Sequence, residues 1–268
     1  MIPYFAPPSW HLGPFTFEVF GLFVAAGIVL GASILAREAL RDRLDAEVMR
    51  DFAPWAVGAG IVGGHLVHLF LYHPEELHKS PFQILKVWDG LSSFGGLLGA
   101  IIFAVFYFRK RGYRFHDYGD VLALGVAPAW AVARLGCFAV HDHPGVPTDF
   151  FMAVNFPGGP RHDLGLYDAL WLAALTGLLF LLRRRRVLAG RLLPLLAILY
   201  SVARIFFDSL RATDLRYVDA RYHGLTPAQY GCLLLIGYGI WGMTRKLVPR
   251  AERGSVKARS PGSPPGRP

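Results

Sequence analysis

Seven apolar segments, separated by shorter polar stretches, follow one another along this chain. Each is close to the ~20 residues that a helix needs to cross the ~30 Å hydrocarbon core of a bilayer. The segments cover approximately residues 17–36, 53–72, 91–108, 119–140, 165–182, 191–207 and 229–244. This pattern predicts an all-α integral membrane protein with seven transmembrane helices.

Composition agrees with the membrane class and sets the domain boundaries. Hydrophobic residues make up 53% of the chain and charged residues 18%, whereas soluble domains carry about 25% charged residues. We predict one polytopic domain over residues 1–248. Residues 249–268 are rich in Pro, Gly, Ser and basic side chains, which is typical of a disordered tail.

The basic residues predict the orientation of the helices. With the seven segments placed, 20 of the 28 Lys and Arg residues fall on one side of the membrane, six on the other and two inside it. The positive-inside rule makes the side with 20 cytoplasmic, so we expect the N-terminus outside and the C-terminus, with its basic tail, inside. Topology therefore accounts for the net charge of +9, and we expect no nucleic acid partner.

Two arginines, Arg134 and Arg204, lie inside apolar segments. A guanidinium near the bilayer centre costs at least ~2.5–3.5 kcal/mol and does not lose its charge. Asp208 and Arg211 follow Arg204 at i+4 and i+7, on the same stripe of the helix. A purely structural Arg204–Asp208 pair is one interpretation. However, the two arginines on this stripe exceed what one carboxylate neutralises, and this surplus favours an anionic ligand.

Polar side chains also cluster after Arg134. Helical spacing of i, i+3 and i+7 places Arg134, Cys137 and His141 on one face. His141, Asp142 and His143 follow one another at the outer boundary of the segment, but no third metal ligand accompanies the two histidines, so we expect no metal. Cys137 is either a nucleophile or a packing residue, and a lone buried cysteine is usually the latter.

Two further features each have a structural and a functional interpretation. A glycine-rich segment that includes Gly95 and Gly96 opens the third helix. It serves close helix packing, or it presents the free N–H groups of a helix N-terminus to an anion. His65 and His68 lie at i and i+3 on the second helix, where they bond to backbone carbonyls or transfer protons.

Six segments together resemble a known family. They are LGPFTFEVFGL, VWDGLSSFGGLLGA, ARLGCFAVHDHPG, RHDLGLYDAL, YSVARIFFDSLR and LTPAQYG. Their order and spacing, between about residues 10 and 248, are similar to those of the prolipoprotein diacylglyceryl transferases. These are bacterial inner-membrane enzymes with seven transmembrane helices and a periplasmic N-terminus.

The resemblance implies an activity: transfer of diacylglyceryl from phosphatidylglycerol to the thiol of a lipobox cysteine in a preprolipoprotein, with release of glycerol phosphate. The implied partners are phosphatidylglycerol, the preprolipoprotein signal peptide and the lipid bilayer. The implied location is the bacterial inner (cytoplasmic) membrane, as a multi-pass protein without a cofactor. The phosphate of the lipid would be the anion that the buried arginines need.

The resemblance also implies site residues. Arg134 and Gly145 match the arginine and the closing glycine of a family signature, and Tyr200 and Arg204 match functional residues on a later helix. Asp142 and Asp208 stand where the family has glutamates. The expected catalytic residues are Arg134, Arg204, His141, Asp142 and His143. The expected substrate-binding residues are Arg134, Gly145, Tyr200, Arg204, Asp208, Gly95 and Gly96.

Three family positions are altered. Phe94 replaces a histidine, Cys137 an asparagine and Phe20 a tyrosine, and phenylalanine neither accepts a proton nor donates a hydrogen bond. Two functions follow. In the first, the chain is a working transferase whose base has moved to His141 or His143. In the alternative, it is a divergent non-lipoprotein paralogue that binds an anionic phospholipid and uses another acceptor, or none.

Overall fold

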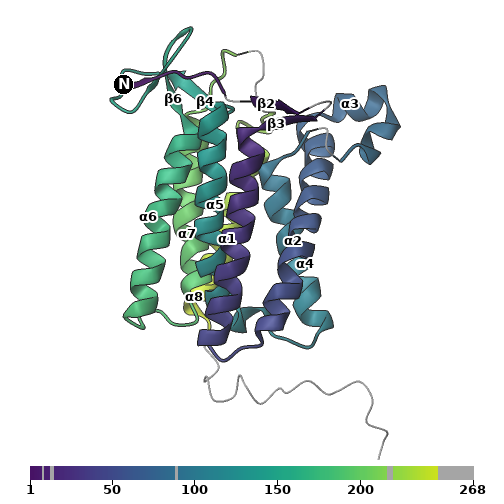
Figure 1. Cartoon of the computed structure of the whole chain (residues 1–268), viewed down its shortest axis with the longest axis vertical. Coiled ribbons are helices and arrows are strands. Elements are labelled where there is room, and N and C mark those ends of the chain that lie inside the picture. Colours follow the sequence, from purple (N-terminus) through teal and green to yellow (C-terminus); the bar gives the residue numbers. More distant parts are fainter. Residues whose placement is uncertain (8, 13–14, 88–89, 216–219, 247–268) are drawn as a thin grey trace, which may run out of the picture.

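Long helices pack side by side, and short strands cover one end of the bundle (Figure 1). The computed structural model describes residues 1–7, 9–12, 15–87, 90–215 and 220–246. The long helices are α1 (Val19–Arg41), α2 (Ala46–Val67), α4 (Ser93–Lys110), α5 (Gly119–Val140), α6 (Leu164–Arg184), α7 (Leu192–Ser209) and α8 (Pro227–Thr244). Each of the seven apolar segments therefore forms a helix. The predicted tail, 249–268, lies outside the described residues.

Six of these helices are long and apolar enough to cross a membrane. In the described part of the chain they are α1, α2 together with the π-helix that continues it (Ala46–Tyr72), α4, α5, α6 and α7. Helix α8 is not in this set, because its glutamine, tyrosines and glycines lower its mean hydropathy. A multi-pass membrane protein is thus supported, whereas the seventh crossing and the orientation of the termini stay predictions.

The mostly helical structure is consistent with the predicted all-α class, but two small sheets that were not predicted cover one end of the bundle. One sheet has the strand order β1-β5-β6-β4, and the other is the antiparallel pair β2-β3. Their strands are β1 (Ile2–Pro3), β2 (Ser9–Leu12), β3 (Phe15–Glu18), β4 (Pro144–Pro147), β5 (Val154–Phe156) and β6 (Gly159–Asp163). Strands this short carry too few residues for a readable apolar alternation.

Short helical turns link α2 to α4 at the same end. They are the π-helix η1 (His68–Tyr72), α3 (Pro74–Lys79) and the 3₁₀ helix η2 (Pro81–Leu85). Buried His65 lies 3.2 Å from the Gly90 carbonyl oxygen through Nδ1 and 3.0 Å from that of Gln83 through Nε2. His65 therefore has the structural role, since its ring anchors this connection to α2.

Glycines let α2 and α4 pack at backbone distance. A Cβ placed on Gly99 would lie 2.4 Å from the Ala59 carbonyl oxygen, and one on Gly95 would lie 2.5 Å from that of Gly63. The Gly95 N–H donates to Ser92 Oγ at 3.2 Å, and the Gly96 N–H donates to the Ser92 carbonyl at 2.9 Å. The structure thus favours the packing interpretation of Gly95 and Gly96 over a free anion site.

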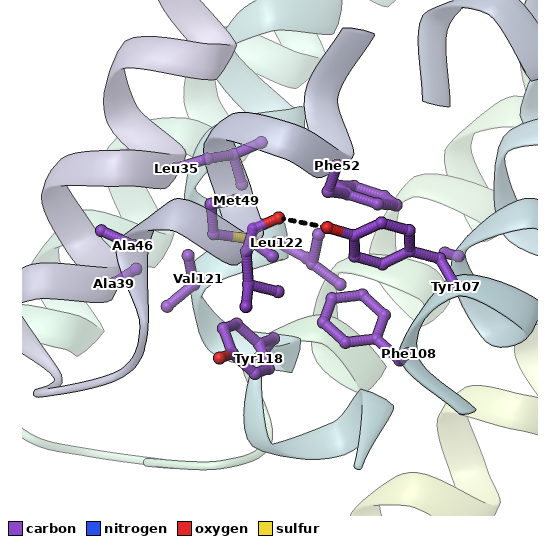
Figure 2. Close-up of a cluster of buried hydrophobic side chains, with 12 residues drawn as sticks. Leu35, Ala39, Ala46, Met49, Phe52, Tyr107, Phe108, Tyr118, Val121 and Leu122 are labelled. Atoms are coloured by element: carbon purple, nitrogen blue, oxygen red, sulfur yellow. Dashed lines mark hydrogen bonds between the residues drawn. The ribbon is translucent and has the colours of Figure 1, made fainter. Parts of the chain in front are cut away.

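Apolar packing holds the opposite end of the bundle together (Figure 2). Residues of α1, α2, α4 and α5 form this cluster, including Met49, Phe52, Phe108 and Tyr118. The Tyr107 hydroxyl donates to the Val48 carbonyl at 3.0 Å within it. The cluster fixes α4 and α5, the helices that carry Phe94 and Arg134.

A buried carboxylate fixes the start of α7. Asp120, in the first turn of α5, accepts from the backbone N–H groups of Gly190 at 2.5 Å and Leu192 at 2.9 Å. Since free N–H groups at a helix N-terminus favour negative charge, this contact stabilises α7 where it begins. It ties α7, and therefore Arg204, to α5.

Candidate active site

Arg134 and Arg204 meet at one carboxylate, Asp168 of α6. Arg204 Nη1 donates to Asp168 Oδ2 at 2.5 Å, and Arg134 Nε lies 3.3 Å from the same oxygen. All three side chains are buried. Among the described residues, Asp168 Oδ1 and Arg134 Nε have no hydrogen-bond partner. The two arginines are thus adjacent, and their shared partner does not use their full hydrogen-bonding capacity.

A second carboxylate, Asp208, lies on the other side of Arg204. Arg204 Nη2 donates to Asp208 Oδ1 at 3.3 Å, which confirms the contact predicted from their i, i+4 spacing. Arg211 Nε lies 2.9 Å from the same oxygen. The Thr226 hydroxyl at the N-cap of α8 donates to Asp208 Oδ2. Asp208 therefore connects both arginines to the start of α8.

The predicted surplus of positive charge was wrong in its count. Arg134, Arg204 and Arg211 face Asp168 and Asp208, and Asp142 also lies within their electrostatic reach. Three guanidinium groups therefore have three carboxylates. No positive charge is therefore left over to attract an anion. An anion that binds here has to replace a carboxylate as the hydrogen-bond partner of these arginines.

Asp168 was missed, although the sequence contained a signal for it. It lies in the fifth apolar segment, where an ionisable side chain is as informative as the two arginines in theirs. Spacing along one helix reveals partners at i+3 and i+4 only. The partners of Asp168 lie on α5 and α7, so the bridge depends on tertiary packing.

A small cavity adjoins the two arginines. It measures about 20 Å³, enough for roughly one water molecule. The polar residues in its wall are Ser93, Arg134, Tyr200, Arg204 and Cys232. Ser93 Oγ accepts from Arg134 Nη2 at 3.4 Å. A phospholipid headgroup does not fit this volume unless the surrounding elements move apart.

Phe94 lines the cavity where α4 approaches α8. A Cβ on Gly231 would lie 2.0 Å from Phe94 Cε2, so the ring packs directly on the backbone of α8. Phe20 contacts α5 instead, where a Cβ on Gly136 would lie 3.3 Å from its ring. Both altered positions therefore contribute apolar packing next to the polar site.

Asp142 and His143 form a hydrogen-bonded pair beside Arg134. His143 Nδ1 bonds to Asp142 Oδ1, and Arg134 Nη1 lies 3.4 Å from His143 Nε2. Because a guanidinium only donates, Nε2 must accept and Nδ1 must carry the proton. The Nε2 lone pair of a neutral His143 thus points into the site.

The charge states of this pair agree with that tautomer. Burial lowers the pKa of His143, and the hydrogen bond to Asp142 opposes this shift without cancelling it. Burial would raise the pKa of Asp142, but the hydrogen bond and charge of His143, with Arg134 and Arg211, hold it below its usual value. Both pKa shifts favour a carboxylate on Asp142 and a neutral imidazole on His143.

His141 does not belong to the site, which corrects the prediction from helical spacing. Helix α5 ends at Val140, and His141 has a left-handed backbone with φ of 51°. It therefore leaves the face that Arg134 and Cys137 share. Its Nδ1 lies 2.7 Å from Asp163 Oδ2, and its ring packs against Tyr4, Phe5, Phe138 and Phe156. This buried arrangement anchors the sheet to α5.

Cys137 does share a face with Arg134, as predicted. Arg134 Nη1 lies 3.7 Å from Cys137 Sγ. One donor atom from each of Cys137, Asp142 and His143 lies within 4.8 Å of the other two, a grouping that suits a metal ion. This grouping was not predicted, since the sequence pattern offered two neighbouring histidines without a third ligand.

Gly145 and Tyr200 support the site from two sides. A Cβ on Gly145 would lie 2.7 Å from the Leu210 carbonyl oxygen, so a glycine is needed where β4 approaches the end of α7. Tyr200 is buried, lines the cavity and packs on Trp130 with ring centroids 4.5 Å apart. Gly145 thus acts through the backbone, whereas Tyr200 faces the space between the arginines and α8.

Comparison with known proteins identifies the family of this chain. Residues 7–245 match the family described as prolipoprotein diacylglyceryl transferase. The chain is similar to the phosphatidylglycerol–prolipoprotein diacylglyceryl transferases of three bacteria. With that of Nitratidesulfovibrio vulgaris it shares 30% identity over 264 residues, 96% of this chain and 98% of the relative.

With the protein of Oleidesulfovibrio alaskensis the identity is 32% over 249 residues, 89% of this chain and 92% of the relative. With that of Geobacillus kaustophilus it is 30% over 265 residues, 93% of this chain and 94% of the relative. A match over nearly the whole length, to relatives of nearly the same length, leaves no large part of the chain outside the similarity. The chain belongs to the prolipoprotein diacylglyceryl transferase family.

Proposed function

We propose that this protein transfers the diacylglyceryl group of phosphatidylglycerol to the thiol of the lipobox cysteine in a preprolipoprotein. The observation that carries the proposal is the buried Arg134–Asp168–Arg204 bridge beside a cavity, in a chain of this family. Paired guanidinium groups match the geometry of a phosphate, whose oxygens accept parallel hydrogen bonds.

The phosphate of the lipid replaces the Asp168 oxygen as the hydrogen-bond acceptor of the two arginines. Asp168 Oδ2 serves both arginines, and Arg134 Nε has no hydrogen-bond partner in the described structure. A phosphodiester with two anionic oxygens offers one to each guanidinium. Binding therefore replaces the shared acceptor by two separate charge-assisted hydrogen bonds.

Transfer then proceeds by displacement at carbon. The acceptor sulfur attacks the glyceryl carbon that bears the phosphate, so a C–S bond forms while the C–O bond breaks. Negative charge grows on the departing glycerol phosphate, where Arg134 and Arg204 stabilise it. Because the charge is larger in the transition state than in the bound lipid, the arginines accelerate the step as well as bind its substrate.

His143 takes the proton of the acceptor thiol. Its Nε2 lone pair faces the site, and Asp142 orients the ring and stabilises the imidazolium. A thiol with a pKa of ~8.5 needs only a modest base. This assignment supplies a base in a chain where Phe94 stands at the family's histidine position.

Entry of the lipid requires α4 and α8 to separate. The cavity measures about 20 Å³, and the Phe94 ring, which packs on Gly231, forms part of its wall between these two helices. We place the protein in the bacterial inner membrane with seven crossings and the sheet end periplasmic. In that orientation the site lies in the outer half of the membrane.

Complementation tests the activity. In a bacterium depleted of its own transferase, this chain is expected to restore diacylglyceryl modification of lipoproteins. Loss of a buried donor to a developing anion typically lowers turnover by about 10²–10³-fold, so Arg134→Gln and Arg204→Gln are expected to fail. Arg50→Gln, which removes an exposed pair with Glu47, is the matched control and is expected to restore modification.

Two results would overturn the proposal. One is a native chain that inserts normally into the membrane and leaves lipoproteins unmodified. The other is full modification by the Arg134→Gln and Arg204→Gln variants. Binding of phosphatidylglycerol without turnover would instead support the alternative function, a lipid-binding paralogue.

A further inference from the structure

The N-terminal segment, residues 1–7, lies at the sheet end of the bundle (Figure 1). Its strand β1 pairs in parallel with β5, and the Ile2 N–H donates to the Ala153 carbonyl at 2.7 Å. Pro3 and Pro7 fix the backbone dihedral φ at their positions and so limit the freedom of the segment. We call residues 1–7 the strap, since backbone bonds fix it to the sheet.

Two aromatic side chains of the strap pack on His141. Tyr4 stacks on the imidazole with ring centroids 5.0 Å apart, and Phe5 lies at 4.4 Å. Phe138 of α5 and Phe156 of β5 complete the surroundings at 5.4 and 5.3 Å. These four rings form an aromatic cage around His141, and the strap supplies half of it.

The cage is needed because hydrogen bonding fixes the His141 imidazole at one nitrogen only. Nδ1 lies 2.7 Å from Asp163 Oδ2, whereas Nε2 is buried and has no hydrogen-bond partner in the described part of the chain. A ring that is held by one bond can still swing about it, and packing against other rings removes that freedom. The strap therefore helps to hold the side chain of His141.

His141 in turn fixes the residues that follow it. Its backbone is left-handed, with φ of 51°, a conformation that a non-glycine residue keeps only where its surroundings hold it. The backbone bonds of this turn are long, 3.2 Å from the His141 N–H to the Phe138 carbonyl and 3.4 Å from the Asp142 N–H to that of Cys137. The contacts of the His141 side chain therefore help to place the Asp142–His143 pair.

We propose that the strap positions the catalytic base of the transfer reaction. In this arrangement, Tyr4 and Phe5 hold His141. His141 then holds the turn on which Asp142 orients His143. Tyr4, Phe5 and His141 are positioning residues, since none of them touches the reacting atoms. The inference rests on the proposed function, in which His143 accepts the proton of the thiol.

The strap acts on His143 through position alone. The charged groups that face His143 are Asp142 of the same turn, Arg134 of α5 and Arg211 beyond α7. Residues 1–7 include no charged side chain. A change in the titration of His143 that follows a change in the strap therefore reports a movement of the ring relative to these three groups.

Turnover and its pH profile test the strap. In Tyr4→Ala/Phe5→Ala, kcat is expected to fall by about fivefold or more, with KM for phosphatidylglycerol unchanged, because the two arginines hold the lipid. The acidic limb of the kcat/KM profile is expected to move to lower pH, because the hydrogen bond from Asp142 that raises the pKa of His143 is weakened. Partial unfolding would lower kcat without moving the limb, so the limb separates positioning from stability.

Matched variants complete this experiment. Tyr4→Phe/Phe5→Tyr keeps both rings and is expected to keep the native profile. Phe5→Leu keeps apolar bulk but loses one ring, and it is expected to move the limb in the same direction by less. His141→Gln is expected to move the limb as Tyr4→Ala/Phe5→Ala does, and combining the two changes is expected to add nothing, since both act through one turn.

Nuclear magnetic resonance tests the positioning without reference to turnover. The full-length protein carries isotope-labelled histidine in phosphatidylcholine nanodiscs, and the ring signals of His143 are identified by their loss in His143→Gln. These signals are expected to move in Tyr4→Ala/Phe5→Ala and to stay in place in Tyr4→Phe/Phe5→Tyr.

The proposal is overturned by ring signals of His143 that Tyr4→Ala/Phe5→Ala leaves unmoved. It is also overturned by an unmoved acidic limb, or by limb shifts that add when the strap and His141 variants are combined. A native chain without transferase activity would contradict the proposed function instead, and the ring signals would still decide the role of the strap.

Discussion

Asp168 controls the electrostatics of the site, because both buried arginines depend on its single oxygen Oδ2. Without a ligand, this carboxylate stabilises two buried guanidinium groups by compensating part of their positive charge. In the proposed mechanism, the phosphate of phosphatidylglycerol takes over part of that task. The bridge would then connect the stability of the empty protein with its affinity for an anionic lipid.

The first prediction concerns this exchange. Asp168→Asn leaves two buried arginines with one charged partner fewer, and breaking a buried ion pair costs about 3–5 kcal/mol. We expect a lower unfolding temperature for this variant in neutral detergent. We also expect phosphatidylglycerol to raise that temperature more for Asp168→Asn than for the native chain, since the phosphate replaces the lost carboxylate.

Asp51→Asn is the control for this experiment. Asp51 pairs with Arg111 at 3.0 Å on the exposed surface, and such pairs contribute at most about 1 kcal/mol. Its unfolding temperature and its response to phosphatidylglycerol are expected to match the native values. Equal stabilisation of the native and Asp168→Asn proteins by the lipid would contradict the exchange.

The second prediction is a pH profile for the base. His143 is active when neutral, so kcat/KM rises with pH through its pKa, which burial holds below its usual value near 6.5. Asp142→Asn removes the hydrogen bond that raises this pKa. The acidic limb of the kcat/KM profile is therefore expected to move to lower pH in this variant. The plateau of kcat/KM is expected to be lower, because the His143 ring loses the hydrogen bond that orients it.

Variants at the histidines separate the base from its surroundings. His143→Gln is expected to lose about 10²–10⁴-fold in turnover together with the acidic limb. His162→Gln removes a nearby histidine that bonds to Tyr167 at 2.9 Å, and it is expected to keep the limb. An acidic limb that persists in His143→Gln would exclude His143 as the base.

At this scale, contacts between two residues of the same helix could be predicted from the sequence. The contacts of Arg134 with Cys137 and of Arg204 with Asp208 follow from i+3 and i+4 spacing. His141 failed the same reasoning, because the chain leaves α5 before the seventh position is reached. A left-handed residue at a helix end is not visible in an apolar pattern.

At the scale of elements, α4 packs on α8 beside the site, and we propose that the lipid enters between them. Phe94 from the first turn of α4 lies on the bare backbone of Gly231. The contact adds apolar atoms to the wall of the cavity, and a glycine at 231 is what lets the ring approach. In the proposed entry path, these helices separate before a headgroup reaches Arg134.

The third prediction tests this contact. A methyl group at position 231 overlaps the Phe94 ring, and such overpacking costs about 1–3 kcal/mol. Gly231→Ala is therefore expected to lower the unfolding temperature, and adding Phe94→Ala is expected to recover part of the loss. Gly237→Ala on the same helix meets nothing within 4 Å and is expected to leave stability unchanged or raise it. Equal effects of the two alanines would contradict the close contact.

The long apolar helices could be predicted from the sequence, whereas the short strands could not. The segment 119–140 coincides with α5 at both ends, and the segment 165–182 differs from α6 by one or two residues. The sheets were not foreseen, because strands of two to five residues depend on partners far along the chain, as β1 does on β5. Pairing of that kind is a tertiary property.

At the scale of the whole molecule, the charge pattern and the architecture agree. Figure 1 shows the strands and α3 at one end of the bundle, and the connections between α1 and α2 and between α6 and α7 at the other. The second end carries the run Arg183–Arg186. The positive-inside rule therefore predicts a periplasmic sheet end.

The fourth prediction is accessibility from the two sides of the membrane. Gly158→Cys, in the turn between β5 and β6, is expected to react with a membrane-impermeant maleimide in intact spheroplasts. Arg185→Cys, exposed beyond α6, is expected to react only after permeabilisation. The native cysteines, at 6% and 4% exposure, provide a low background. The reverse labelling pattern would invert the topology.

The central claim is that Arg134 and Arg204 bind the phosphate of phosphatidylglycerol, and lipid affinity tests it most directly. Dissociation constants for phosphatidylglycerol and for diacylglycerol, which lacks the phosphate, are compared between the native chain, Arg134→Gln and Arg204→Gln. A hydrogen bond to a charged group contributes about 1.5–3 kcal/mol, so each variant is expected to bind phosphatidylglycerol at least about tenfold more weakly, with diacylglycerol affinity unchanged. Native affinity for phosphatidylglycerol in both variants, or an equal loss for the two lipids, would contradict the account.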